Sequence, residues 1–255
     1  MEIASLLNPV NVVTFLLLFI RFASFLAFLP VFNYPTIPMI AKAAFAFWLS
    51  VVFFPITPKI TFEINLFNLI LAVLSEATLA FLVGSALNLV FDILRFAAEQ
   101  ISFVMGFTMA NVFDPNANIN STILSQFFIW VAVLIFLSFG GEHLEIYLLA
   151  KSLKSLPLGA IFDIHSFYEF FIKYMYKYFL FGFSLAFPIL AVSLLSDIIF
   201  AMIMKTMPQF NLLVVGFPIK IAISFLVLMV ILGAMMRVFQ KEVLEVFNVL
   251  ASIIG

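Results

Sequence analysis

Three charged residues, Arg21, Glu76 and Asp197, lie inside stretches of sequence that are otherwise apolar. A charge near the centre of a membrane-spanning helix costs about 2.5–3.5 kcal/mol on insertion scales, so such residues face protein or water rather than lipid. They could line a hydrated path and bind an ion or substrate, or they could pair and hold helices together. The residue types alone leave both interpretations open.

A second charged group consists of Asp92, Arg95 and Glu99, spaced at i, i+3 and i+7. This spacing places them on one face of a helix, where opposite charges can pair. We interpret them as helix–helix contacts or as residues near a membrane boundary rather than as a pore lining.

The sequence lacks the motifs of known catalytic sites. His143 lies in Gly141-Glu142-His143-Leu144-Glu145, which has no second histidine one turn away to complete a zinc-binding H-E-x-x-H. The absence of cysteine excludes thiolate metal sites and iron–sulfur clusters. We therefore expect no enzyme activity, no cofactor and no metal site.

Composition sets the class of protein. Of the 255 residues, 65% are hydrophobic and 10% are charged, and the net charge is −1. Soluble domains are about 45–50% apolar and about 25% charged, so a soluble globular enzyme is excluded. High hydrophobicity excludes disorder, and the lack of basic excess argues against a nucleic-acid partner. The composition predicts an all-α membrane protein that contacts lipid.

The pattern of apolar residues predicts a single polytopic domain over residues 1–255, with six hydrophobic helical segments arranged as hairpins. Their approximate ranges are 9–29, 40–54, 64–105, 121–139, 178–204 and 219–236. The third is longer than one bilayer crossing, which needs about 20 residues, so we expect a long or broken helix. An amphipathic connection, 142–177, carries eight charges and both histidines, and an amphipathic tail occupies 237–255.

The first of two unusual loops covers residues 106–120. It combines methionine and phenylalanine with glycine and proline, a combination typical of an irregular and adaptable apolar segment. We consider two interpretations, a deformable hydrophobic seal and an interfacial loop lying among lipid headgroups. The residues concerned are Met105, Gly106, Phe107, Met109, Phe113, Asp114 and Pro115.

The second loop covers residues 205–218 and is apolar, although it is bracketed by turn-forming residues. Its aromatic side chains offer large contact areas, and its amides can bond to a partner's backbone. We interpret it as the tip of a helical hairpin that packs against another surface, and an ordinary interfacial connection is the alternative. The residues concerned are Pro208, Gln209, Phe210, Asn211, Gly216, Phe217 and Pro218.

These motifs resemble those of the FliR family, the export-gate subunits of flagellar and virulence-type type III secretion. The resemblance covers nearly the whole chain, and the second loop is its most specific part. Lys42 and Lys205-Thr206 depart from the family's usual pattern. The matching residues are Met105-Gly106, Phe113-Asp114-Pro115, Asn120, Leu156-Pro157-Leu158-Gly159, Ala186-Phe187-Pro188, Pro208-Gln209-Phe210-Asn211, Val215-Gly216-Phe217-Pro218, Arg21, Pro30, Pro38, Glu76 and Gly84.

The resemblance implies a subunit of the flagellar protein export gate in the bacterial inner membrane, at the base of the flagellum. It implies FliP-like and FliQ-like partner subunits, other flagellar export membrane proteins, and unfolded protein substrates in transit. It also implies that the residues named above in the first loop plug the pore and that the helices are tilted within the assembly. The second loop, which resembles the hairpin of the FliQ-type subunit, is then expected to be an assembly contact rather than part of the seal.

Two other functions are compatible with some of the residues. A small secondary transporter or ion-conducting protein could use Arg21, Glu76 and Asp197, but the sequence shows no pair of related broken helices. An intramembrane enzyme is disfavoured by the lack of a catalytic constellation.

Overall fold

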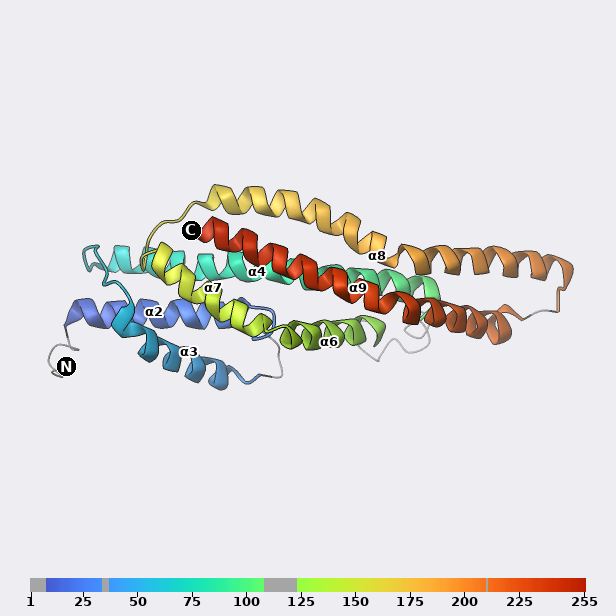
Figure 1. The fold of residues 1–255 in the computed structure, drawn as a ribbon, viewed down its shortest axis with the longest axis horizontal. Coiled ribbons are helices and arrows are strands. Elements are labelled where there is room, and N and C mark those ends of the chain that lie inside the picture. Colours follow the sequence, from blue (N-terminus) through green and yellow to red (C-terminus); the bar gives the residue numbers. More distant parts are fainter. Residues whose placement is uncertain (1–7, 34–36, 108–122, 210) are drawn as a thin grey trace. The chain divides into compact units, whose positions relative to one another are not determined.

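The computed structural model describes residues 8–33, 37–107, 123–209 and 211–255, without the side chain of Leu213. Within these ranges every regular element is helical, which confirms the predicted fold class (Figure 1). Two short elements are the 3-10 turn η1 (Phe54–Ile56) and the π-helical turn η3 (Leu212–Gly216). The α-helices are α2 (Pro9–Phe28), α3 (Met39–Phe53), α4 (Leu66–Met105), α6 (Ile123–Ser138), α7 (Gly141–Ser155), α8 (Ile164–Thr206) and α9 (Phe217–Ile254).

Five stretches in the described residues are long and apolar enough to cross a membrane. They are α2, α3 with η1, α4, α8, and α9 with the end of η3. The pair α6 and α7, bent by 68° at their junction, raises the number to six if it counts as one span. This agrees with the predicted number of segments.

Two predicted segments, those of α8 and α9, are longer in the structure, whereas α4 keeps its predicted bounds to within two residues. Helices α4, α8 and α9 have 40, 43 and 38 residues, and at about 1.5 Å per residue each is about twice as long as the roughly 30 Å of a bilayer's hydrocarbon core is thick. Helix α8 absorbs the end of the predicted connection, and α9 continues without a break into the predicted tail. The connection 142–177 is helical for most of its length because α7 and the start of α8 lie in it.

Local sequence explains where these helices begin. Asn8 accepts a hydrogen bond from Val10 N at 3.1 Å, and Pro9 occupies the first helical position of α2. Asn65 Oδ1 accepts from Asn68 N at 2.8 Å at the start of α4. Gly140, with a φ of 74°, allows the left-handed backbone at the bend before α7.

The chain forms two compact units. Unit 1 comprises Met1–Leu89, Leu137–Lys173 and Val243–Gly255. Its α2 and α3 lie side by side as a hairpin (Figure 1). Gly84 allows α4 to approach α2 closely, since a Cβ there would lie 2.5 Å from Phe28 Cβ. Asn88 Nδ2 also donates to Phe28 O at 2.8 Å.

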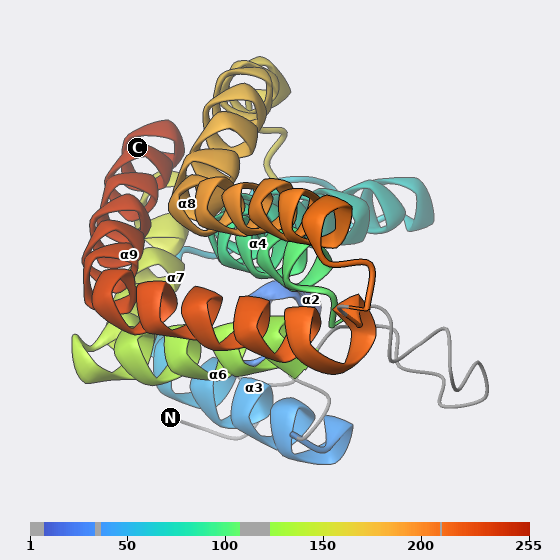
Figure 2. The same cartoon turned by 90° about the vertical axis from the view of Figure 1, so that its right-hand side faces the viewer.

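Unit 2 comprises Val90–Phe136 and Tyr174–Glu242. Its core includes Phe91, whose ring contacts Phe136 and Phe239 with centroids 5.6 and 5.2 Å apart. Gly182 of α8 packs closely on α4, since a Cβ there would lie 2.9 Å from Phe96. The hairpin of α8 and α9 in this unit faces the viewer in Figure 2.

Candidate functional site

Two of the three charges singled out in the sequence form one buried ion pair in unit 1. The side chains of Arg21 on α2 and Glu76 on α4 are 2% and 1% exposed. Arg21 Nε donates to Glu76 Oε2, and Arg21 Nη2 donates to Glu76 Oε1 at 2.9 Å. This two-pronged geometry satisfies both charges at once, which a buried pair needs to offset the cost of leaving water.

The rest of the Arg21 guanidinium binds the end of α7. Its Nη1 donates to Ser152 O at 3.2 Å and to Leu156 O at 2.9 Å, and its Nη2 reaches Pro157 O at 3.4 Å. Carbonyl groups at the C-terminal end of a helix carry partial negative charge, so a guanidinium there is favourable.

Glu76 holds the other end of the same connection. Its Oε1 accepts a 2.7 Å hydrogen bond from Gly159 N, and the neighbouring Ser75 Oγ donates to Ala160 O at 2.5 Å. Gly159 has a φ of 72°, and a Cβ there would lie 2.8 Å from Ala72 Cβ. We call Arg21, Glu76 and residues 156–160 the latch, because together they fix the connection between α7 and α8.

The third charge, Asp197 on α8, pairs with Lys220 in the first turn of α9, within unit 2. The Nζ atom lies 2.7 and 2.8 Å from the two carboxylate oxygens. The Lys220 side chain is 7% exposed and that of Asp197 is 50% exposed. The sequence did not identify this partner because Lys220 is 23 residues away from Asp197, and only the packing of α9 on α8 brings the two together.

A further ion pair joins α8 and α9 in unit 2. Lys177 Nζ lies 2.8 Å from Glu242 Oε2, and it also lies 5.3 Å from the ring centre of Tyr174 and 5.8 Å from that of Tyr178. Asp92 and Arg95 pair at 2.8 Å, as their spacing predicts, but both side chains are about half exposed.

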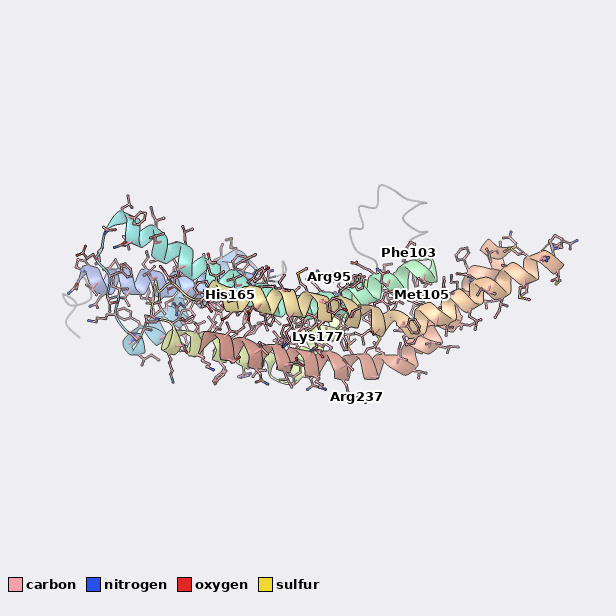
Figure 3. The ribbon with its side chains drawn as sticks, turned by 90° about the horizontal axis from the view of Figure 1, so that it is seen from above. Arg95, Phe103, Met105, His165, Lys177 and Arg237 are labelled. Carbon is pink, nitrogen blue, oxygen red and sulfur yellow. The ribbon has the colours of Figure 1, made fainter. Side chains whose placement is uncertain are left out.

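Helix α4 ends at the start of the first loop. Met105 is fully buried and Gly106 follows with a φ of 89°. Phe107 N donates to Ser102 O at 3.0 Å, the six-residue closure of a Schellman motif, for which glycine is the usual stop residue. Figure 3 labels Met105 at this end of α4.

The residues at this end of α4 pack on α9, within unit 2. A Cβ on Gly106 would lie 2.9 Å from Phe217 Cε1, so Phe217 occupies the space beside the glycine. The Phe107 ring meets Phe225 edge-on, with centroids 5.9 Å apart. We call Phe217 and Phe225 the α9 seat. The structure thus brings together one residue from each of the two predicted loops.

The other predicted loop residues are placed only in part. Met109, Phe113, Asp114, Pro115 and Phe210 lie outside the described residues. In the second loop Pro208, Gln209, Asn211 and Pro218 are exposed, whereas Gly216 is buried. In the part of the chain that the structure describes, no three His, Asp or Glu side chains gather as a metal site would require.

Comparison with known proteins decides the family. Residues 12–246 match the family described as bacterial export proteins, family 1. The chain belongs to this family.

Named relatives agree over almost their full lengths. The chain is 30% identical over 247 residues to the flagellar biosynthetic protein FliR of Bacillus subtilis (strain 168), covering 94% of this chain and 95% of the relative. It is 30% identical over 241 residues to the FliR of Aquifex aeolicus (strain VF5), covering 93% and 92%. For the FliR of Escherichia coli (strain K12), identity is 23% over 236 residues, with 92% and 90% covered.

The chain is therefore a subunit of flagellar type III protein export, as its motifs indicate. It is a structural transport component that associates with other flagellar export proteins, and its apolar helices make it a multi-pass membrane protein.

Proposed function

We propose that this export-family chain helps to form the channel through which unfolded flagellar proteins leave the cell, and that residues 106–115 act as a hydrophobic plug. The observation that carries the proposal is the end of α4. There a Schellman stop at Gly106 sits against Phe217, and Phe107 sits against Phe225. A plug needs a fixed root, and these contacts supply one.

The assembly follows from the same family membership. We assign FliP-like and FliQ-like subunits as partners, the bacterial inner membrane as the location, and the flagellar basal body as the larger structure. Many large apolar side chains of α8 and α9 are exposed in the isolated chain, among them Phe187, Met202 and Val230. An exposed apolar surface of this extent is expected to be covered by lipid or by another protein.

The second loop remains a proposed assembly contact, supported by the exposed Pro208, Gln209 and Asn211. Phe217 belongs in addition to the root of the first loop, because its ring fills the space beside Gly106. This contact supports a role in sealing that the sequence interpretation did not give to Phe217.

The described charges disfavour the transporter alternative. Arg21 and Glu76 are both buried and fully engaged with each other and with backbone groups, so neither is free to bind a substrate. Asp197 is engaged with Lys220. We propose that the chain has no catalytic role and acts by assembling and sealing.

The test is to shorten residues 109–115 in the intact complex and to measure ion permeability of the membrane. A replacement of equal length with glycine and serine is the matched control for chain length. We expect both variants to leak while complex yield stays normal, because the apolar side chains make the seal. Unchanged permeability in both, with normal assembly, would reject the plug.

A further inference from the structure

Unit 1 contains an apolar groove that none of the functions above uses. It has a volume of about 370 Å³ and lies between the first turns of α4 and the connection before α8. Four apolar side chains at the groove are strongly exposed, with Ile161 at 91%, Ile164 at 58%, Leu74 at 56% and Leu71 at 46%. A cluster of exposed apolar side chains is typical of a surface that binds a partner.

The latch builds one wall of this groove. Glu76 and Ser75 hold the backbone at Gly159 and Ala160, and Gly159 packs with no room for a Cβ against Ala72 and Phe62. The groove is therefore held by a buried ion pair rather than formed by loosely placed side chains.

Most polar side chains of the groove are already hydrogen-bonded within the chain, which favours an apolar occupant. Ser75 Oγ is already bonded to Ala160 O, and Asn68 Nδ2 is bonded to Glu63 O at 3.0 Å. Among the three polar side chains that line it, these two are used within the chain, and Thr78 lies exposed. An occupant would gain mainly by burying apolar area.

The position of the groove favours protein over lipid as the occupant. Its outer wall, residues 157–163, is non-helical, and irregular backbone does not face lipid within the hydrocarbon core. The adjoining start of α8 carries His165, Glu169, Lys173 and Lys177 before its long apolar stretch begins (Figure 3). These charges separate the groove from the part of α8 that suits the hydrocarbon.

The rim of the groove is acidic. Exposed Glu63 and Asp163 are chain neighbours of the lining residues Phe62 and Phe162, whereas the nearest cation before Glu63 is Lys59 and the nearest before Asp163 is Lys154. Asp163 stays ionised because hydrogen bonds from Ser166 Oγ and from His165 N lower the pKa of its carboxyl. Acidic groups around an apolar centre favour partners that carry the opposite charge.

We propose that this groove docks another protein subunit of the export assembly, through a helix whose exposed apolar side chains are flanked by lysine or arginine. The inference rests on the proposal that the chain works in a hetero-oligomeric complex. It adds the place of one contact and the chemistry of the segment that fills it.

The test uses the chain in its assembled complex in the membrane, with a photo-crosslinking amino acid at Ile161 or Leu74. Met39, which is 85% exposed on α3 and lies outside the groove, is the control position. We expect both groove positions, and not Met39, to crosslink to one segment that carries apolar residues beside lysine or arginine. Lipid adducts alone, or a segment without basic residues, would overturn the proposal.

Charge substitutions at exposed residues close to the lining residue Phe62 in the chain separate docking from folding. Glu63→Lys should lower the crosslinking yield several-fold, and Lys59→Glu should raise it, at equal complex yield. An unchanged yield in both variants would overturn the acidic-rim argument and the proposal with it. If the complex copurifies normally but the groove fails to crosslink, this inference fails alone; if no complex exists, the proposed assembly fails as well.

Discussion

The ion pairs Arg21–Glu76 and Asp197–Lys220 differ in how far their side chains are exposed to water. In unit 1, Arg21 and Glu76 are both almost fully buried, and each bonds to backbone as well as to the other. In unit 2, Lys220 is buried but Asp197 is half exposed, and the pair joins only two helices of one hairpin. A charge inside an apolar segment can therefore fix a fold or close a hairpin, and burial distinguishes the two.

The latch should be the more costly pair to break. Arg21→Ala leaves the Glu76 carboxylate buried without a counter-charge and removes the cap from the end of α7. We expect a loss of about 3–5 kcal/mol of stability. The measurement is the chain's steady-state level and the thermal stability of the purified complex.

Two control variants sharpen that result. Arg21→Lys keeps the charge but loses the two-pronged contact, so it should be intermediate. Normal stability of Arg21→Ala would show that the latch does not hold unit 1 together.

Gly159→Ala tests the latch from its backbone side. The new Cβ would meet Ala72 at 2.8 Å on a left-handed backbone, and we expect a loss of about 1–3 kcal/mol. Gly233→Ala is the matched control, because nothing lies within 4 Å of its Cβ position and alanine favours helix. Equal effects of the two substitutions on thermal stability would contradict the tight packing at Gly159.

The pair in unit 2 should show an asymmetry that the latch does not. Asp197→Ala leaves the Lys220 ammonium buried without its partner, at a cost of about 1–3 kcal/mol. Lys220→Met should cost less, because Asp197 can be hydrated at the surface. Thermal unfolding of the complex with each variant gives the comparison, and a larger loss for Lys220→Met would reverse the argument.

Arg95→Ala should have the smallest effect. Both members of its pair with Asp92 are half exposed, and exposed pairs contribute about 0.2–1 kcal/mol. The same thermal measurement checks this, and a loss as large as that of Arg21→Ala would mean that Arg95 is buried by a partner in the assembly.

Much of the fold could be predicted from the sequence because the apolar stretches largely determine where the helices lie. The boundaries of α2, α3 and α6 agree with the predicted segments within about two residues. Helix α7 was predicted as a connection because its charges lower its hydropathy, although a charged helix can still bury one face. The continuation of α9 through Arg237 was missed for the same reason.

The charges of the site were found, but their pairing was not. Arg21 and Glu76 each lie alone in an apolar segment, so the sequence indicates that each needs a partner. They are 55 residues apart, however, and only the packing of α2 on α4 brings them together. The role of Gly159 was hidden because a glycine after Leu156-Pro157-Leu158 reads as an ordinary turn. The contact between Gly106 and Phe217 depends on how α9 lies against α4, which no local pattern encodes.

The central claim is that the latch maintains the fold while the α9 seat controls the seal. The most direct test is ion permeability per assembled complex in Phe217→Ala and Gly159→Ala. Phe217→Ala removes the ring beside Gly106 and should raise permeability at near-normal complex yield, whereas Gly159→Ala should lower the yield without making the remaining complexes leak. A tight membrane in Phe217→Ala, or leaking complexes in Gly159→Ala, would contradict this division between the two regions.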